Sequence, residues 1–342
     1  MLYCDTRLGG IARWSTAAPE DGMRIPDEML SCVCFLAVQT AEGFRYPGTG
    51  FFIGLDSEIV PGFLHVYLVT AKHCVARAER YGGLYVRLNT HAGDSEFVHI
   101  NTPWIKPEDP ASDVAAIPWV PPQEKFVYKT IAADMFATPE VIKEREIGIG
   151  DEVFITGLFV KRAGKNKNLP ILRGGIIAAM PDEPLKDKNT GLDYHAYIGE
   201  VRSIGGLSGS PVFVQLGPAR PTKGKINLGQ VHYFLLGLVR GHWDDDGKEL
   251  IPLAAEDDDA ASDRAAAINM GMAVFTPTED LLKMLNSPEE KARRKKQEEK
   301  LTAKDSPTED SALPEENFSK ADFESALKTV SRKLSDEEKS GT

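Results

Sequence analysis

The chain has 342 residues, of which 42% are hydrophobic, enough for one large or two small buried cores. Its formal net charge of -11 argues against a protein built mainly to hold nucleic-acid phosphates, which needs a basic surface. Residues Met1–Trp14 lack the apolar centre of a secretory signal, and no apolar run approaches the roughly 18–20 residues of a membrane helix. We therefore expect a cytoplasmic chain without a membrane segment.

The four cysteines, at positions 4, 32, 34 and 74, are sparse, as is typical of thiols that stay reduced in a cytoplasm. Cys32 and Cys34 would share one face of a strand. No second Cys or His pair at zinc-ligand spacing accompanies them, so we expect small buried hydrophobes rather than metal ligands. The sequence predicts neither a metal nor a cofactor.

Between Ser31 and about Thr276 the chain is a series of short β-type runs separated by Gly, Pro, Asn and Asp. This spacing predicts an all-β protein of the barrel or sandwich type. Pro139–Arg145 predicts a short helix or turn between two halves. The strand-like runs are Cys32–Val38, Gly50–Ile53, Leu64–Thr70, Leu84–Leu88, Val153–Ile155, Val212–Val214 and Phe234–Val239.

The pattern becomes helical near residue 276. Thr276 as a capping hydroxyl, Pro277 at the first helical position and Glu279 three residues after the cap predict a helix over residues 276–286. Residues 287–317 are rich in Lys, Arg and Glu, so we expect a solvated linker. Its basic run, Lys291–Lys296, is bracketed by glutamates, which favours a solvated face over nucleic-acid binding.

A short amphipathic helix is predicted over residues 318–335. Ser319 and Asp322 resemble a capping box, and Phe323, Leu327 and Leu334 line one helical face. Because an isolated helix of about 15 residues is marginal in water, this apolar face would dock on the folded body or on a protein partner. The absence of any role is equally open.

Three segments place reactive side chains at the ends or edges of predicted strands. Leu68–Cys74 carries a histidine, Ser112–Ile117 carries an acid, and Gly205–Pro211 carries a serine between glycines.

Together these segments supply the groups that acyl transfer needs. The Ser208 hydroxyl is a weak nucleophile at neutral pH and requires a base, for which His73 is the candidate. Asp113 would hold the other imidazole nitrogen and stabilise the imidazolium. The N–H groups of Gly206 and Ser208 would form the oxyanion hole, since glycines let backbone donors converge.

The motifs Thr-Ala-x-His-Cys, Ser-Asp-Val-Ala and Gly-x-Ser-Gly-Ser-Pro, in this order, resemble the trypsin/chymotrypsin superfamily of serine proteases. The last motif and the turn Gly48–Phe52 are more similar to bacterial and heat-shock-type members. The resemblance covers roughly residues 31–286. It implies two packed six-stranded antiparallel β-barrels (chymotrypsin-like), over residues 31–138 and 139–275, after an N-terminal extension of residues 1–30. The site would lie between the barrels.

Two departures from the family pattern have consequences. Members activated by proteolysis carry an Asp before the serine, but this chain has Leu207, which argues against activation by a new N-terminus. The resemblance also places a disulfide partner for Cys74 near Gly48, where there is no cysteine. We therefore expect Cys74 to be a free buried thiol.

The resemblance also implies where the primary substrate pocket lies, although the charges there give no single preference. Arg202 in the pocket would favour an acidic residue before the scissile bond. The acidic insert, residues 244–263, would instead attract basic substrates at long range. The implied pocket residues are Arg202, Ser203, Val239, Arg240, Gly241 and Gly271.

The sequence thus predicts a serine endopeptidase that cleaves polypeptides through an acyl-enzyme. The alternative is a catalytically silent or partner-activated protease-fold binding module that acts through residues 318–335, because a fold does not guarantee its chemistry. The oligomeric state and the residue preference stay open.

Overall fold

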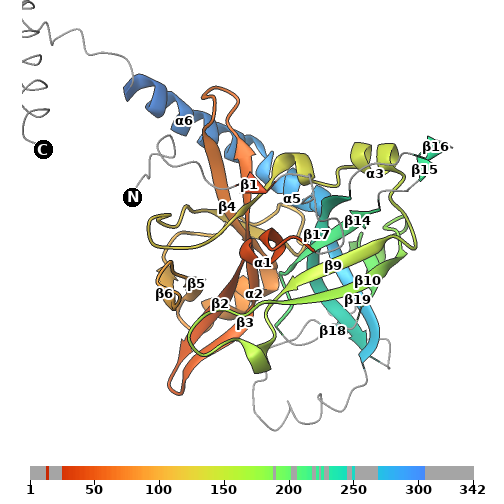
Figure 1. Cartoon of the computed structure of the whole chain (residues 1–342), viewed down its shortest axis with the longest axis horizontal. Coiled ribbons are helices and arrows are strands. Elements are labelled where there is room, and N and C mark those ends of the chain that lie inside the picture. Colours follow the sequence, from red (N-terminus) through yellow and green to blue (C-terminus); the bar gives the residue numbers. More distant parts are fainter. Residues whose placement is uncertain are drawn as a thin grey trace, which may run out of the picture. The chain divides into compact units, whose positions relative to one another are not determined.

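The computed structural model describes residues 13–14, 25–187, 190–201, 206–217, 221–222, 225–226, 231–244, 249–250 and 269–304. Two β-sheets dominate these residues, and few helices accompany them (Figure 1). The acidic insert lies almost wholly outside the described residues, as do Arg202, Ser203 and the segment 318–335.

The N-terminal sheet has eight strands, six of which run in the antiparallel order β6-β5-β2-β3-β4-β7. Two further strands pair in parallel, β8 with β3 and β1 with β8. The strands are β1 (Arg13–Trp14), β2 (Val33–Thr40), β3 (Gly43–Asp56), β4 (Leu64–Thr70), β5 (Leu84–Asn89), β6 (Ser95–Ile100), β7 (Ala115–Pro118) and β8 (Thr130–Ala132).

The C-terminal sheet closes on itself as a six-stranded antiparallel barrel, because β14 pairs with both β9 and β17 in the cycle β14-β9-β10-β13-β19-β17. A short strand, β18, adds to β17. The strands are β9 (Glu152–Gly157), β10 (Ile171–Ala179), β13 (Tyr197–Glu200), β14 (Pro211–Leu216), β17 (His232–Asp244), β18 (Glu249–Leu250) and β19 (Asn269–Pro277), with hairpins β11 (Leu185–Lys186) to β12 (Asp193–Tyr194) and β15 (Pro221–Thr222) to β16 (Lys225–Ile226).

These two sheets confirm the all-β, double-barrel prediction. Every strand-like run expected from the sequence lies within or largely within an observed strand. The sequence missed β10, whose adjacent Gly174 and Gly175 have low strand propensity. A Cβ on Gly175 would lie 2.2 Å from the Glu200 carbonyl oxygen, so the close approach of β10 and β13 there requires glycine.

Helices are short and lie between the strands or after them. The predicted helix between the halves is confirmed as α3, and the Thr138 hydroxyl accepts a hydrogen bond from the Val141 N–H at its start. The helices are α1 (Glu28–Ser31), α2 (Lys72–Glu79), α3 (Pro139–Arg145), α5 (Thr278–Leu285) and α6 (Pro288–Lys304), with 3₁₀ turns η1 (Ala133–Met135) and η2 (Val160–Arg162).

The predicted cap of the helix after β19 is wrong. Thr276 belongs to β19, and α5 begins two residues later with Pro277 as its cap. The Thr278 hydroxyl donates a 2.6 Å hydrogen bond to the Leu235 carbonyl instead of capping the helix. Pairing of β19 with β17 continues through Pro277, which delays the start of the helix.

The prediction of a solvated linker over residues 287–317 is wrong for Pro288–Lys304, which form helix α6. Arg293 and Arg294 donate hydrogen bonds to the Tyr67 hydroxyl. Glu298 accepts from Ser57 at 2.6 Å and contacts His65 Nε2 at 2.9 Å. Sequence-based reasoning missed these contacts because they join residues more than 220 positions apart.

Buried apolar side chains join the two sheets. The larger core cluster contains Phe51 and Phe52 from β3 together with Phe213, Leu235 and Leu238 from β14 and β17. Because the cluster crosses the boundary between the sheets, their packing contributes directly to stability.

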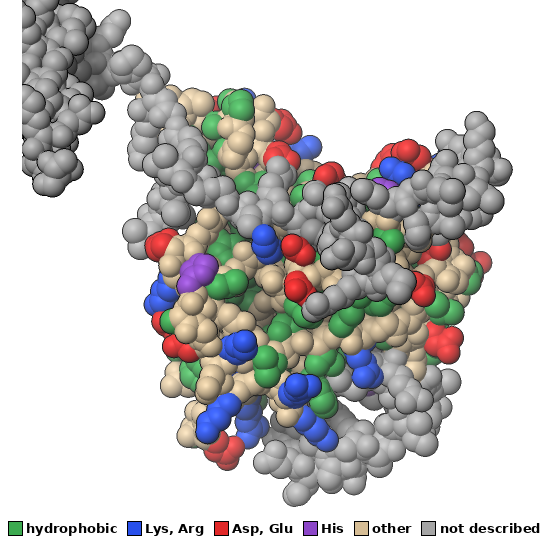
Figure 2. Space-filling model, in the orientation of Figure 1, with side chains coloured by type: hydrophobic (Ala, Val, Ile, Leu, Met, Phe, Trp, Pro, Cys, Tyr) green, Lys and Arg blue, Asp and Glu red, His purple; other side chains and the backbone are tan. Residues whose placement is uncertain are grey.

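On the face drawn in Figure 2, acidic and basic side chains are interspersed over the described surface. In the described part of the chain, no helix is both long enough and apolar enough to cross a membrane.

The shared core predicts a large cost for truncating Phe213, whose side chain is fully buried. Phe213→Ala should lower the free energy of unfolding by about 3–5 kcal/mol, because it leaves a cavity at the junction of the sheets. Ile149→Ala is the control, since Ile149 is 69% exposed and its truncation should change stability by less than about 0.5 kcal/mol. Chemical denaturation measures both; equal, small effects would contradict a shared core.

Candidate active site

His73 and Asp113 lie side by side because β4 pairs with β7. Thr70, at the end of β4, is opposite Ala115, at the start of β7. His73 follows in the first turn of α2, and Asp113 precedes β7. Asp113 Oδ2 lies 2.7 Å from His73 Nδ1, and Asp113 Oδ1 accepts a 2.9 Å hydrogen bond from the His73 backbone N–H. This two-point contact fixes both the imidazole and its backbone.

Both groups of this pair are largely shielded from water, with 14% of the His73 side chain and 6% of the Asp113 side chain exposed. Burial by itself lowers the pKa of His73, but the charge of Asp113, the neighbouring Cys74 and the hydrogen bonds with both outweigh burial and raise that pKa. Burial likewise raises the pKa of Asp113, and the His73 charge with its hydrogen bonds brings it below the usual value. The pair therefore favours a carboxylate beside a protonated imidazole.

Ser208 lies in a tight turn before β14. Gly209 donates to the Val239 carbonyl at 2.8 Å and Ser210 donates to the Leu207 carbonyl at 2.9 Å. Gly209 has φ of 78°, and a Cβ there would lie 2.3 Å from the Thr70 hydroxyl. Only glycine fits at this position, next to the strand that leads to His73.

Thr49 on β3 connects the serine turn to the N-terminal sheet. Its N–H donates to the Ser208 carbonyl at 2.9 Å, and its hydroxyl donates to the Gly206 carbonyl at 2.9 Å. The same hydroxyl accepts from the Leu158 N–H, and the Thr49 carbonyl accepts from the Thr70 hydroxyl at 2.7 Å. One residue thus positions the serine turn against the end of β4.

The buried Cys74 thiol lies between His73 and Ser208. Its Sγ is 3.5 Å from His73 Nε2 and 3.8 Å from the Ser208 carbonyl oxygen. A Cβ on Gly48 would lie 2.6 Å from this sulfur, so residue 48 does face Cys74 as the family resemblance implied. Cys74 is a free thiol, as are Cys32 and Cys34, and burial raises the pKa of the latter two.

The structure therefore brings the three predicted catalytic residues to one place, but with unequal contacts. His73 and Asp113 are hydrogen-bonded. Ser208 is 5% exposed and adjoins the pair through the Cys74 sulfur. Among the residues that the structure describes, no hydrogen bond joins the His73 and Ser208 side chains.

Both predicted oxyanion donors, Gly206 and Ser208, belong to the residues that the structure describes. Within the described ranges, neither the Gly206 N–H nor the Ser208 N–H donates to a backbone oxygen, in contrast to the N–H groups of Gly209 and Ser210. Gly206 has φ of 99°, a conformation that strongly favours glycine. Two unengaged N–H groups beside a serine can stabilise a developing negative charge.

Of the implied substrate-pocket residues, those in the described part are embedded in the sheet. Val239 donates to the Ser210 carbonyl at 2.9 Å, and Gly241 pairs with Val274. Gly271, with φ of 80°, accepts from Val201 at 2.7 Å.

Arg240 is buried rather than open to a substrate. It donates to the Ala111 carbonyl at 2.8 Å and to Asp187 Oδ2 at 2.9 Å, and it lies 3.9 Å from the centre of the Tyr194 ring. Sequence reasoning missed this role, because Asp187 lies 53 positions away with no motif around it.

The segment that leads into Asp113 is held from two sides. Arg240 binds the Ala111 carbonyl, and the Lys72 ammonium donates to the Pro110 carbonyl at 2.8 Å. Arg240 also contributes to lowering the pKa of Asp113. These two basic residues therefore help to position the acid. No group of three metal-ligating side chains occurs in the described ranges.

No family model matches the chain, and the comparison with curated proteins finds no match. Among solved structures, an inactive form of Rv3671c from M. tuberculosis H37Rv is 16% identical, with a TM-score of 0.39, covering 80% of this chain and 96% of that one. A catalytically inactive tobacco etch virus protease complexed with substrate is 12% identical, with a TM-score of 0.37, covering 74% of this chain and 81% of that one. These are weak similarities, and the function proposed below rests on the geometry of this chain.

The Arg240–Asp187 ion pair predicts a large loss of stability when Arg240 is replaced by an uncharged residue. Arg240→Met should lower the free energy of unfolding by about 3–5 kcal/mol, because it leaves the Asp187 carboxylate buried without its guanidinium. The exposed pair Arg45–Glu42 provides the control, and Arg45→Met should cost less than about 1 kcal/mol. Denaturant titration measures the free energy of unfolding of both variants. Equal stability of Arg240→Met and Arg45→Met would contradict a stabilising role of the Arg240–Asp187 pair.

Proposed function

We propose that this chain is a serine endopeptidase. The observation that carries the proposal is the buried Asp113–His73 pair, with contacts of 2.7 and 2.9 Å, next to a serine in a glycine turn. An acid that orients an imidazole beside a hydroxyl is the arrangement used for nucleophilic acyl transfer. The Gly-x-Ser-Gly-Ser-Pro motif further supports a bacterial type, and the sparse cysteines support a cytoplasmic location.

In the proposed reaction, Ser208 Oγ attacks the carbonyl carbon of the scissile peptide as His73 Nε2 removes its proton. The Gly206 and Ser208 N–H groups stabilise the resulting oxyanion. Collapse of the tetrahedral intermediate breaks the C–N bond, and the leaving amine takes the proton from His73. Water then attacks the acyl-enzyme with His73 again as the base, which releases the acid product and restores Ser208.

Asp113 supports this proposed reaction in two ways. Its Oδ2 holds the proton on Nδ1, so that Nε2 is left as the nitrogen that would take the proton of the serine hydroxyl. Its charge stabilises the imidazolium that forms in each half-reaction. The proton transfer also requires Nε2 to reach Ser208 Oγ in place of the Cys74 sulfur, and such contacts often tighten only when substrate binds.

A second candidate function is a partner-activated or catalytically silent protease-fold binding module. It is favoured by the missing hydrogen bond between His73 and Ser208 within the described residues, and by the Cys74 contact of Nε2. Under this hypothesis a polypeptide partner, recruited through residues 318–335, would complete the site or merely bind.

Labelling with a fluorophosphonate tests the nucleophile. The wild type should form a covalent adduct and cleave a diverse peptide library, whereas Ser208→Ala should lose labelling and lose about 10⁴–10⁶ in kcat. Ser210→Ala is a matched control, because Ser210 is in the same motif and its buried hydroxyl has no hydrogen-bond partner in the described structure. A folded wild type that neither labels nor cleaves would favour the binding module, and labelling that persists in Ser208→Ala would contradict the assignment.

The pH profile tests the Asp113–His73 pair. Because Asp113 raises the pKa of His73, the imidazole keeps its proton to a higher pH, and kcat/KM should rise with pH with a midpoint above the ordinary value of about 6.5. Asp113→Asn removes the charge, so the midpoint should move to lower pH, and kcat should fall about 10⁴-fold. The exposed Asp134→Asn should leave both unchanged, and an unshifted midpoint in Asp113→Asn would contradict the pairing.

A further inference from the structure

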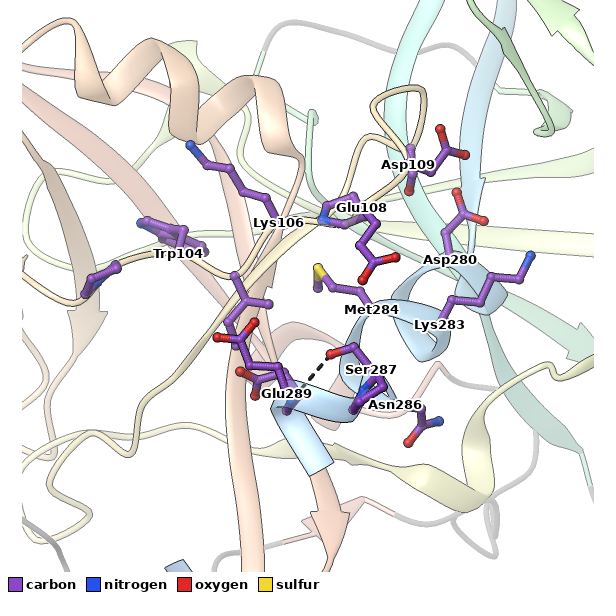
Figure 3. Close-up of a pocket in the computed structure, with 16 residues that line it drawn as sticks. Trp104, Lys106, Glu108, Asp109, Asp280, Lys283, Met284, Asn286, Ser287 and Glu289 are labelled. Carbon is purple, nitrogen blue, oxygen red and sulfur yellow. Dashed lines mark hydrogen bonds between the residues drawn. The ribbon is translucent and has the colours of Figure 1, made fainter. Parts of the chain in front are cut away.

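A cavity of about 970 Å³ lies beside the segment that leads into Asp113 (Figure 3). One wall is residues 103–109 with Ser112, and the other is the last part of α5 and the start of α6. None of the catalytic residues His73, Asp113 and Ser208 lines it. The cavity is therefore a second site, separate from the proposed active site.

Carboxylates without a basic partner dominate the charge of this cavity. Glu108, Asp109, Asp280 and Glu289 line it and make no ion pair with another described residue. The two lysines of the lining are paired elsewhere. Lys106 contacts Glu79 at 2.8 Å and Lys283 contacts Glu279 at 2.9 Å, and neither of these glutamates lines the cavity. The cavity therefore has an excess of negative charge.

Asp280 is a partly buried carboxylate of this cavity. Burial raises the pKa of Asp280, as do the nearby carboxylates of Asp109 and Glu279, although Ser112 and Lys283 act in the opposite direction. Burial and like charges therefore disfavour the ionised carboxylate, and a cation that entered the cavity would stabilise it.

The rest of the lining is apolar. Trp104, Ile105, Pro107, Met284 and Pro288 belong to it, and Figure 3 shows Met284 beside the Glu108 carboxylate. An ammonium or guanidinium on an aliphatic stem matches this mixture, because the stem packs on the apolar surface and the charge reaches the carboxylates. The N-termini of α5 and α6, at Thr278 and Pro288, favour anions, but an anion in the cavity would meet four carboxylates that make no ion pair with a described residue.

We propose that this cavity binds a basic polypeptide segment through its lysine or arginine side chains. The volume is several times that of one side chain, so more than one residue of the segment would be held. The wall that the segment contacts, residues 103–112, continues directly into Asp113. Occupancy would therefore act on the position of the acid, an effect that rests on the proposed function, whereas the binding itself does not.

Binding is tested in the Ser208→Ala background, so that the probe is not cleaved and the outcome is independent of catalysis. The probe is a short fluorescein-labelled peptide of alternating lysine and leucine, measured by fluorescence anisotropy. Glu108→Gln with Asp280→Asn should weaken binding by about tenfold or more, because two charge-assisted contacts are lost. The same peptide with every lysine acetylated should bind at least as weakly to the unsubstituted background.

The matched control removes the same charge elsewhere. Glu124→Gln with Glu144→Gln replaces two exposed carboxylates outside the cavity and should change the affinity by less than about twofold. Equal weakening in both double variants would show nonspecific attraction to an acidic protein and overturn the proposal. Unchanged affinity in the cavity variant, with its thermal stability retained, would overturn it too.

Trp104 supplies a readout that localises the bound peptide. Addition of the unlabelled peptide should change the intrinsic tryptophan fluorescence, and Trp104→Phe should remove most of this change while it keeps the apolar wall. A fluorescence change that persists fully in Trp104→Phe would place the peptide elsewhere and contradict the assignment.

Discussion

The two hydrogen bonds that Asp113 accepts from His73 constrain the residues around them. A carboxylate on a side chain that is only 6% exposed is costly unless donors surround it, and here both the imidazole and the backbone N–H of one residue supply them. The hydrogen bond to the His73 backbone N–H requires the end of β4 and the start of α2 to lie beside Asp113, two residues before β7. The antiparallel pairing of β4 with β7 meets this requirement, and Lys72 and Arg240 hold the remaining free segment, residues 110–111.

Hydrogen bonds of a single residue, Thr49, likewise connect the serine turn to the strand that leads to His73. Thr49 uses its N–H, its carbonyl and its hydroxyl to connect the serine turn, β4 and the turn after β9. Gly48 beside it leaves room for the Cys74 sulfur. Hydrogen bonds and packing thus join the two sheets at this place, and Phe213 extends the junction into the core.

The sequence predicted the elements whose signal is local. The apolar runs Cys32–Val38 and Leu64–Thr70 are bounded by turn residues, and both were correctly predicted to be strands. The start of α3 at Thr138–Pro139 is a local capping signal, and this helix was also predicted. What it could not predict depends on partners distant in the chain. The helix α6 is stabilised by Tyr67 and His65, and the burial of Arg240 depends on Asp187. The motifs predicted that His73, Asp113 and Ser208 share one site, but they did not predict that Nε2 contacts Cys74.

The segment 103–112 connects the two sites of this protein. On one side it is fixed by Lys72 and Arg240, which are themselves buried or partly buried. On the other side it faces an acidic cavity in which four carboxylates make no ion pair with a described residue. A ligand in the cavity can change the position of this segment only if it binds one position of the segment more tightly than another. Because Asp113 follows this segment directly, a change of even a fraction of an ångström there alters its two contacts with His73, and with them the geometry of the base in the proposed reaction.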